Sequence, residues 1–367
     1  MFPANTYIPI TEFFLQLAMK KEVLDNPSVI AGLDPSGMLG AVDRSPELLL
    51  NPLSMKNRPR ITNDRKIEQI VFCGMGGSAI AADVIIDWLI DRLKIPSLVV
   101  RDARLPRFVN KTTLVVALSY SGETTETLSL YKAAMSRGCF TFAISTGGSL
   151  IDLCRRHESP FLTIRPSVSP RAALFQMVGA CSIVLEETGL ASRLLSAVGE
   201  AAKEVSALRR LYASTNKSSV NKAKQFAYSV KDGLPVVYAL QRMACVARRF
   251  KNQLNENSKI PAKFDLLPES GHNEVEAWHD ASNLIPLLIR DPGESSFERK
   301  IMDGFKRTIT NAAKTEALEV RTRSNSSLGR LLCPIFFLDY VSIYLALLRG
   351  VDPTPTVLIR EFRKSIS

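Results

Sequence analysis

Two short loops in this chain combine glycine turns with hydroxyl side chains, a combination that suits the binding of an anion. Gly74–Ser78 follows the apolar run Ile67–Cys73, and Ser119–Thr124 follows the apolar run Leu114–Leu118. Each segment is typical of a strand, a tight turn and a helix, so free backbone N–H groups and the positive end of a helix dipole point to one place. The hydroxyl groups that can add neutral donors belong to Ser78, Ser119, Ser121 and Thr124. The two loops together predict a site for one monophosphate.

The first loop alone leaves three interpretations open. Gly74–Ala79 also fits the relaxed dinucleotide pattern G-x-G-x-x-A, and Asp102 ends the next predicted strand, where a ribose-binding carboxylate could lie. A nucleotide cofactor, a phosphosugar and a plain tight turn all suit this segment. The second loop favours the phosphosugar, because Ser-x-Ser-Gly-x-Thr has no role in a dinucleotide fold. Neither loop contains Lys or Arg, which excludes a Walker-type triphosphate loop.

Strands and helices alternate around these loops. At 367 residues the chain has room for two α/β units of roughly 120 to 180 residues each. From Lys66 the predicted strands are Ile67–Cys73, Ser97–Arg101, Leu114–Leu118, Thr141–Ser145 and Phe161–Ile164, with helices at Ala79–Leu93, Thr124–Arg137 and Arg171–Glu187. Such alternation predicts a doubly wound parallel sheet with helices on both faces, which binds ligands beyond the carboxyl ends of its strands. Both glycine loops lie there.

A second unit follows a predicted helix at Leu190–Tyr212 and a polar break at Ser214–Ser219. Its predicted strands are Pro235–Ala239, Leu284–Ile289 and Leu318–Arg321, and its helices are Met243–Lys259, Phe297–Thr310 and Leu328–Leu348. We interpret it as a divergent copy of the first unit that has lost the glycine turn. The predicted organisation is a partly helical leader covering the first domain (residues 1–65), a first domain (66–213) and a second domain (214–367).

The second unit contains the side chains suited to proton transfer. Glu256 lies near the predicted end of a helix, and His272 lies in a Gly-His-Asn turn. A carboxylate and an imidazole are what proton transfer beside a carbonyl group requires. From spacing alone, a solvated capping charge is the more common explanation for Glu256, and the same caution applies to His272.

Five motifs in one order resemble a known family. They read Gly-Gly-Ser, Ser-Tyr-Ser-Gly-x-Thr, Ser-Pro-Arg, Asn-Glu-Asn-x-Lys and His-Asn-Glu. The first two resemble the sugar-isomerase (SIS) domain, a phosphosugar-binding α/β unit. The full series resembles the bifunctional phosphoglucose/phosphomannose isomerases, which have two SIS domains. The likeness runs from about Lys66 to Lys364 and leaves only the leader outside.

The resemblance implies a role for each matching residue. The residues that would hold the substrate phosphate are Gly77, Ser78, Ser119, Ser121 and Thr124. Glu256 would be the base that moves a proton between C1 and C2 of the open-chain sugar. His272 would assist ring opening from the neighbouring subunit, and Arg171 would stabilise the enediolate oxyanion.

Three further positions bear on specificity and on departures from the family pattern. Thr356 matches the small residue that leaves room for both C2 epimers. Glu123 stands where many members have Asn, and we expect it to face solvent at a helix N-terminus, where its charge is favourable. Arg363 stands where a Lys is expected for ring opening, and its donor geometry differs from that of Lys.

The resemblance implies a cytoplasmic homodimeric isomerase that needs neither cofactor nor metal. It would interconvert fructose 6-phosphate with glucose 6-phosphate and mannose 6-phosphate, which share one cis-enediol. Three alternatives belong to other classes: a phosphosugar sensor without activity, a nucleotide-dependent oxidoreductase and a glutamine-dependent aminosugar synthase. The presence of both Glu256 and His272 argues against the sensor. The synthase would need an N-terminal Cys nucleophile, and the chain has none.

The amino-acid composition indicates which kinds of ligand and which cellular environment suit this chain. A net charge of +11 favours anionic ligands, but the basic residues are scattered and no nucleic-acid-binding motif is present. Six cysteines without a C-x-x-C pair are typical of a reduced, cytoplasmic protein, and three histidines without a ligand pattern argue against a metal site. Leu331–Leu348 imitates a membrane span, yet Asp339 at its centre predicts a buried or interface helix that serves subunit contact.

Overall fold

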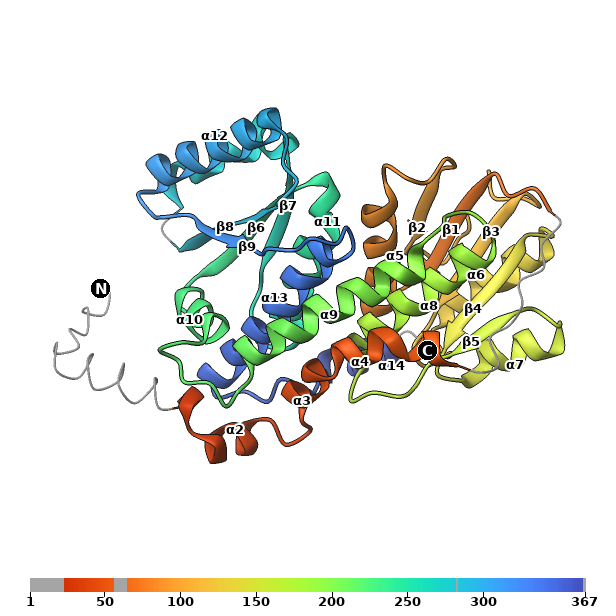
Figure 1. Ribbon diagram of the computed structural model, residues 1–367, viewed down its shortest axis with the longest axis horizontal. Helices are drawn as coiled ribbons and strands as arrows, with labels where there is room; N and C mark the ends of the chain where they lie inside the picture. The colour runs from red at the N-terminus through yellow and green to blue at the C-terminus, as the bar shows by residue number, and fades with distance from the viewer. Residues whose placement is uncertain (1–22, 56–64, 282, 366–367) are drawn as a thin grey trace.

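The computed structural model describes residues 23–55, 65–281 and 283–365. Two parallel sheets, each with helices packed against it, lie at opposite ends of the long axis of the molecule (Figure 1). The first sheet has the strand order β2-β1-β3-β4-β5. Its strands are β1 (Gln69–Gly74), β2 (Ser97–Val100), β3 (Thr113–Leu118), β4 (Phe140–Ser145) and β5 (Phe161–Thr163). The predicted doubly wound α/β fold is therefore confirmed.

The central strands of the first sheet are apolar because helices cover both faces. Every residue of β3 is buried, as are all but the first of β1. β1 pairs with β2 on one side and with β3 on the other, so the direction of winding reverses between β1 and β3. The crevice at such a reversal is where doubly wound sheets bind ligands. The two glycine loops follow these two strands.

The helices of the first unit begin close to their predicted positions. They are α5 (Gly76–Leu89), α6 (Thr125–Ser136), α7 (Gly148–Arg156) and α8 (Leu174–Glu187). The short helix α7 was not predicted from the sequence. The helix predicted from Arg171 begins instead as a single 3-10 turn at Pro170–Ala173 and becomes α-helical at Leu174.

The second sheet repeats the winding of the first. Its order β7-β6-β8-β9 corresponds to β2-β1-β3-β4, as expected of a divergent copy. Its strands are β6 (Leu234–Leu240), β7 (Lys263–Leu267), β8 (Leu284–Arg290) and β9 (Leu318–Arg321). Its helices are α10 (Lys222–Ser229), α11 (Ala244–Glu256), α12 (Ser296–Ala313), α13 (Gly329–Leu348) and α14 (Val357–Ser365). Strand β7 was not predicted, because this edge strand contains Lys263 and Asp265 and only its last residue is buried.

Charged side chains fill the reversal point of the second sheet. This point lies between β6 and β8, and the turns after these strands carry Arg242 and Asp291. Arg242 Nε lies 3.3 Å from Asp291 Oδ2, and its Nη2 donates to Glu298 Oε1. In the first unit, glycine loops lie at the equivalent position. Here the Arg242 guanidinium pairs with the carboxylates of the same chain instead.

The apolar helix α13 is a core element of the chain itself. It is long and apolar enough to cross a membrane, but 94% of its most apolar window is buried inside the protein. Membrane-length helices with this burial are common in the cores of folded domains. The expectation that α13 serves subunit contact is wrong, because α9, α10 and α11 of the same chain already cover it.

The leader joins both units rather than covering the first alone. Its described helices are α2 (Pro27–Leu33), α3 (Met38–Asp43) and α4 (Ser45–Leu50). α4 packs on α8 and α9, whereas α3 contacts α13. Residues 1–22 and 56–64 of the predicted leader lie outside the described residues.

Helix α9 (Leu194–Tyr212) bridges the units through Glu204. The Glu204 carboxylate accepts hydrogen bonds from the backbone N–H groups of Asn325 and Ser326, both at 3.0 Å, and from the hydroxyls of Ser324 and Ser326. These donors belong to the loop between β9 and α13. Although burial raises the pKa of Glu204, these hydrogen bonds outweigh it, and the pKa lies below its ordinary value.

This depressed pKa predicts a loss of stability in acid. The folded state stabilises the ionised form of Glu204. The contribution of this carboxylate to the free energy of unfolding is therefore complete above its ordinary pKa, and it disappears as pH falls through the lower folded-state pKa. We expect Glu204→Gln to lower the free energy of unfolding at pH 7 by about 1 to 2 kcal/mol. Urea denaturation from pH 7 to pH 3 should show the two proteins converging in acid. Glu200→Gln on the same helix is the control, and equal losses in both variants at every pH would contradict the prediction.

Candidate active site

The two glycine loops contact each other at the reversal point of the first sheet. The backbone N–H of Tyr120 donates to Ser78 Oγ at 3.2 Å, which ties the second loop to the first. Within the second loop, Ser119 Oγ donates to Thr124 Oγ1 at 3.1 Å and accepts from the Gly122 N–H at 3.1 Å. Three of the four hydroxyl groups predicted to hold a phosphate, those of Ser78, Ser119 and Thr124, are therefore gathered at one edge of the sheet, where α5 and α6 begin. Ser121 is exposed, and its Oγ accepts from the Glu123 N–H at 3.2 Å.

Two glycines of these loops pass close to other backbone, and at Gly122 no other residue fits. Gly122 has a φ of +74°, and a Cβ atom there would lie 1.9 Å from the Gly147 carbonyl oxygen. A Cβ atom on Gly77 would lie 3.1 Å from the Cα atom of Arg171. The first loop and Arg171 are thus packed backbone to backbone.

Arg171 is buried and almost fully committed to protein acceptors. Its side chain is 3% exposed. Nε donates to Asn257 Oδ1 at 2.6 Å, and Nη2 donates to the carbonyl oxygens of Pro353 at 2.6 Å and Thr354 at 2.9 Å. Burial lowers the pKa of Arg171, and the Glu256 carboxylate acts against that shift. The guanidinium therefore works as a fixed charge with little freedom to move.

Glu256 is the last residue of α11 and lies beside this guanidinium. Its Oε2 atom is 3.4 Å from Arg171 Nη1, and its side chain remains 23% exposed. The carboxylate is thus oriented by a buried cation but open to solvent on one side. A base that must reach a small substrate needs this combination of fixed position and access.

A second layer of buried polar groups supports the pair. Asn257 Nδ2 donates to Ser342 Oγ at 2.9 Å, so the amide that accepts from Arg171 is held by α13. Arg249 donates to both carboxylate oxygens of Asp339 at 3.0 and 2.9 Å, and to the Arg171 carbonyl oxygen at 2.8 Å. None of these supporting roles was predicted from the sequence, although Asp339 stood out as a charge within an apolar run. That interruption was the available signal.

His272 lies away from Glu256 within one chain. Glu256 ends α11 before β7 begins, whereas His272 follows β7 and is exposed. The five residues of β7 span roughly 13 Å at about 3.3 Å per residue. The histidine and the carboxylate are therefore at opposite edges of the second sheet. Glu274, two residues on, accepts from Tyr238 Oη at 2.6 Å and fixes this loop.

Glu123 is exposed, as predicted, and its carboxylate lies at a helix N-terminus, but the helix is α7 rather than the one that follows its own loop. Its carboxylate accepts from the backbone N–H and the hydroxyl of Ser149, both at 2.7 Å. These hydrogen bonds lower the pKa of Glu123. Ser149 lies in the first turn of α7, so the carboxylate caps that helix rather than the helix that follows its own loop. Its charge therefore lies at the N-terminus of α7.

The remaining predicted residues lie at the C-terminal end. Thr356 immediately precedes α14 and is partly buried, in a segment that contacts Arg171 through Pro353 and Thr354. Thr356 is thus brought to the Arg171–Glu256 pair by its neighbours in sequence. Arg363 lies in the last turn of α14 and is exposed, roughly two helical turns beyond Thr356.

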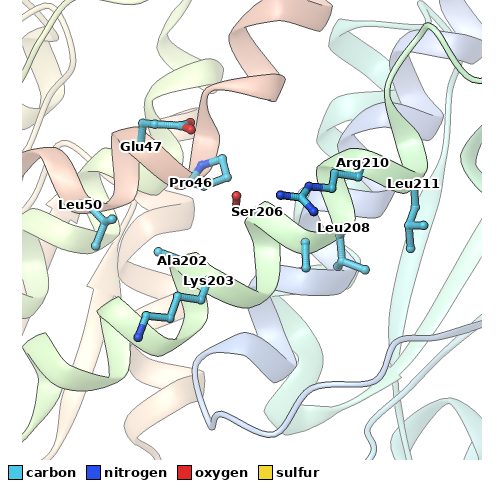
Figure 2. A pocket seen from close by; sticks show the side chains of 10 residues that line it. Pro46, Glu47, Leu50, Ala202, Lys203, Ser206, Leu208, Arg210 and Leu211 are labelled. Atoms are coloured by element: carbon cyan, nitrogen blue, oxygen red, sulfur yellow. The ribbon is translucent and has the colours of Figure 1, made fainter.

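A pocket of about 610 Å³ lies elsewhere, between α4 and α9 (Figure 2). Its lining is Pro46, Glu47, Leu50, Ala202, Lys203, Ser206, Ala207, Leu208, Arg210 and Leu211. The residues predicted for the site do not line it. Among the described residues, no cluster of three His, Cys, Asp or Glu side chains could hold a metal ion.

Several known proteins with similar sequences are named bifunctional phosphoglucose/phosphomannose isomerase. The bifunctional phosphoglucose/phosphomannose isomerase of Caldicellulosiruptor bescii is 34% identical over 82% of this chain and 90% of that protein. The protein of the same name from Aquifex aeolicus is 32% identical over 81% of this chain and 90% of its own. Residues 219–366 match the family model described as the bacterial phospho-glucose isomerase C-terminal SIS domain.

A solved structure supports the fold independently. The C-terminal domain of glucosamine-fructose-6-phosphate aminotransferase from Francisella tularensis superposes with a TM-score of 0.67 and 17% identity, covering 87% of this chain and 98% of that chain. Identity this low shows the shared SIS architecture alone. The sequence relatives go further, since they exceed 30% identity over most of both chains. The chain therefore belongs to the family of bifunctional phosphoglucose/phosphomannose isomerases.

Proposed function

We propose that this protein interconverts fructose 6-phosphate with both glucose 6-phosphate and mannose 6-phosphate. One observation carries the proposal: the first glycine loop packs directly on Arg171, and Arg171 Nη1 lies 3.4 Å from Glu256 Oε2. A phosphate held by the loops would thus lie next to a fixed cation and an accessible carboxylate. The family relationship supports the same chemistry.

The proposed mechanism needs one base and one fixed charge. The two loops bind the phosphate through neutral donors at the N-termini of α5 and α6. Glu256 removes a proton from C1 or C2 of the open-chain sugar and returns it to the other carbon. Arg171 keeps one Nη1 hydrogen directed toward the Glu256 side and stabilises the enediolate oxygen. Because glucose and mannose 6-phosphate give the same cis-enediol, one base serves both substrates.

The proposal includes a homodimer with composite sites and a cytoplasmic location. His272 is exposed and lies at the sheet edge opposite Glu256, so a histidine that assists ring opening at this carboxylate would have to come from a second copy. Arg363, also exposed, would contribute its charge near the phosphate or the ring oxygen.

We also propose a domain boundary near residue 213. The first sheet lies within residues 69–163 and the second within 234–321. The family model for the C-terminal domain begins at residue 219, close to that boundary. The first domain, from residue 66, would hold the phosphate, and the second, to residue 367, would supply the base.

A chelator experiment tests the reaction and its independence of metal. Purified protein treated with EDTA should convert fructose 6-phosphate to glucose and mannose 6-phosphate at the rate of untreated protein. The two products are followed in separate coupled assays, with the coupling enzymes supplied with excess Mg²⁺ only after the reaction is stopped. Loss of activity that returns on adding a divalent metal would overturn the metal-free mechanism. Phosphosugar binding without either product would overturn the proposed reaction.

A further inference from the structure

The segment Asp352–Thr356, which we call the strap, connects α13 to α14 and is held by its backbone. From one side, Arg171 Nη2 donates to the carbonyl oxygens of Pro353 and Thr354. From the other side, Lys259 Nζ donates to the carbonyl oxygens of Pro355 at 2.7 Å and Pro353 at 3.4 Å. Two cations thus fix the strap through its peptide groups.

Lys259 also binds the helix that carries Glu256. Its Nζ atom donates to the carbonyl oxygen of Glu256 itself, at the C-terminal end of α11. An ammonium group has three N–H donors, and here each has a carbonyl acceptor. One side chain therefore joins the backbone of Glu256 to the peptide group that immediately precedes Thr356.

The backbone of Lys259 is unfavourable for a lysine. Its φ is +56°, in the left-handed region. α11 ends with a turn in which the Ile260 N–H donates to the Leu254 carbonyl oxygen at 3.2 Å, a geometry that favours glycine at the residue before Ile260. A lysine there costs backbone free energy, which its three hydrogen bonds and its position at the negative end of a helix dipole offset. The hydrogen bonds of the lysine side chain, rather than the geometry of the turn, therefore explain why a lysine stands at this position.

We propose that Lys259 is a positioning residue that sets the spacing between Glu256 and Thr356, and so the ratio of the two aldose products. The inference rests on the proposed function. Before the last step the hydrogen on O1 passes to O2, which leaves the enediolate charge on O1. Glu256 then gives its proton to C2, the C–H bond forms from the electrons of the C1–C2 double bond, and O1 becomes the aldehyde oxygen. The room that the strap leaves at C2 decides which epimer is released. A strap that shifts by a fraction of an ångström changes that choice.

The ratio of glucose to mannose 6-phosphate formed from fructose 6-phosphate, measured from initial rates, tests this role. The ratio does not depend on the fraction of folded enzyme, so a purely structural defect leaves it unchanged. We expect Lys259→Met and Lys259→Gly to change it about threefold or more, a difference of roughly 0.7 kcal/mol between two barriers. Lys259→Gly removes the three hydrogen bonds of the Lys259 side chain, which we call the clamp, and also the cost of a positive φ at this residue. It should therefore fold at least as well as Lys259→Met. Lys259→Arg should be closer to the unmodified protein, and Lys251→Met, within α11, is the control.

Hydrogen–deuterium exchange tests the clamp without reference to activity. The Thr354 and Thr356 amides should exchange faster in Lys259→Met and Lys259→Gly than in the unmodified protein and in Lys251→Met. Unchanged exchange, or an unchanged product ratio in both variants, would overturn the inference. If the unmodified protein makes only glucose 6-phosphate, new mannose 6-phosphate in the variants supports it and the same single product overturns it. An unmodified protein with no isomerase activity would refute the proposed function. The exchange rates would still test whether Lys259 holds the strap.

Discussion

Glu256→Gln should lower kcat for fructose 6-phosphate by about a thousandfold, with KM changed by no more than about twofold. The amide keeps the size of the carboxylate and an oxygen acceptor for Arg171 Nη1, 3.4 Å away. It cannot take up a proton from carbon, so only the transfer between C1 and C2 is lost. Steady-state kinetics with both products measured separately will show whether both reactions fall together. A variant that loses one product alone would mean that the two epimers use different bases.

Mixing inactive variants tests whether the site needs two chains. Glu256→Gln and His272→Ala should each be inactive or nearly so as homodimers. Co-expressed in equal amounts, they should recover about a quarter of the unmodified activity, because half of the dimers are hybrids and one of the two sites in each hybrid is intact. Activity no higher than that of the separate variants would place His272 and Glu256 in the same chain's site or remove His272 from the reaction.

Asp339→Leu should lower the free energy of unfolding by about 3 to 5 kcal/mol. The carboxylate is 2% exposed and Arg249 is 3% exposed, so the substitution leaves a guanidinium charge buried without its partner. Arg249 also donates to the Arg171 carbonyl oxygen, so kcat should fall as the support for the site is lost. Urea denaturation at pH 7 gives the stability change.

Two matched variants isolate the buried charge as the cause. Arg249→Met combined with Asp339→Leu should recover most of the lost stability, because no unpaired charge then remains at this position in the core. Asp152→Ala breaks an exposed ion pair with Arg155 and should cost less than about 1 kcal/mol. A double variant as unstable as Asp339→Leu would show that packing, rather than charge, explains the loss.

Local pattern was sufficient to predict most of the fold. Apolar runs such as Leu114–Leu118 mark strands because both faces of the sheet are covered, and the loops after them follow from glycine and hydroxyl residues. The same signals failed for β7, an edge strand with polar residues, and for α7, a short helix whose N-terminus is capped by Glu123. Both elements depend on contacts with residues that are distant in sequence.

The candidate site was predictable only in part for a similar reason. The motifs identify Arg171 and Glu256, but nothing in their spacing shows that a guanidinium from one unit reaches the helix end of the other. Asn257 and Lys259 belong to a motif that was recognised, yet their hydrogen bonds to Ser342 and to the strap exist only once α13 is in place. Contacts between units carry information that local sequence does not.

The ion pairs at the reversal point of the second sheet bear on how the chain acquired its activity. With Arg242 bound to Asp291 and Glu298, that crevice presents a phosphate with a cation already neutralised, unlike the hydroxyl loops of the first sheet. Under the proposed function the two repeats have different roles, because the first would bind the substrate phosphate and the opposite edge of the second would supply the base, Glu256. A duplicated fold would then give each chain one site built from two unlike halves rather than two equivalent sites.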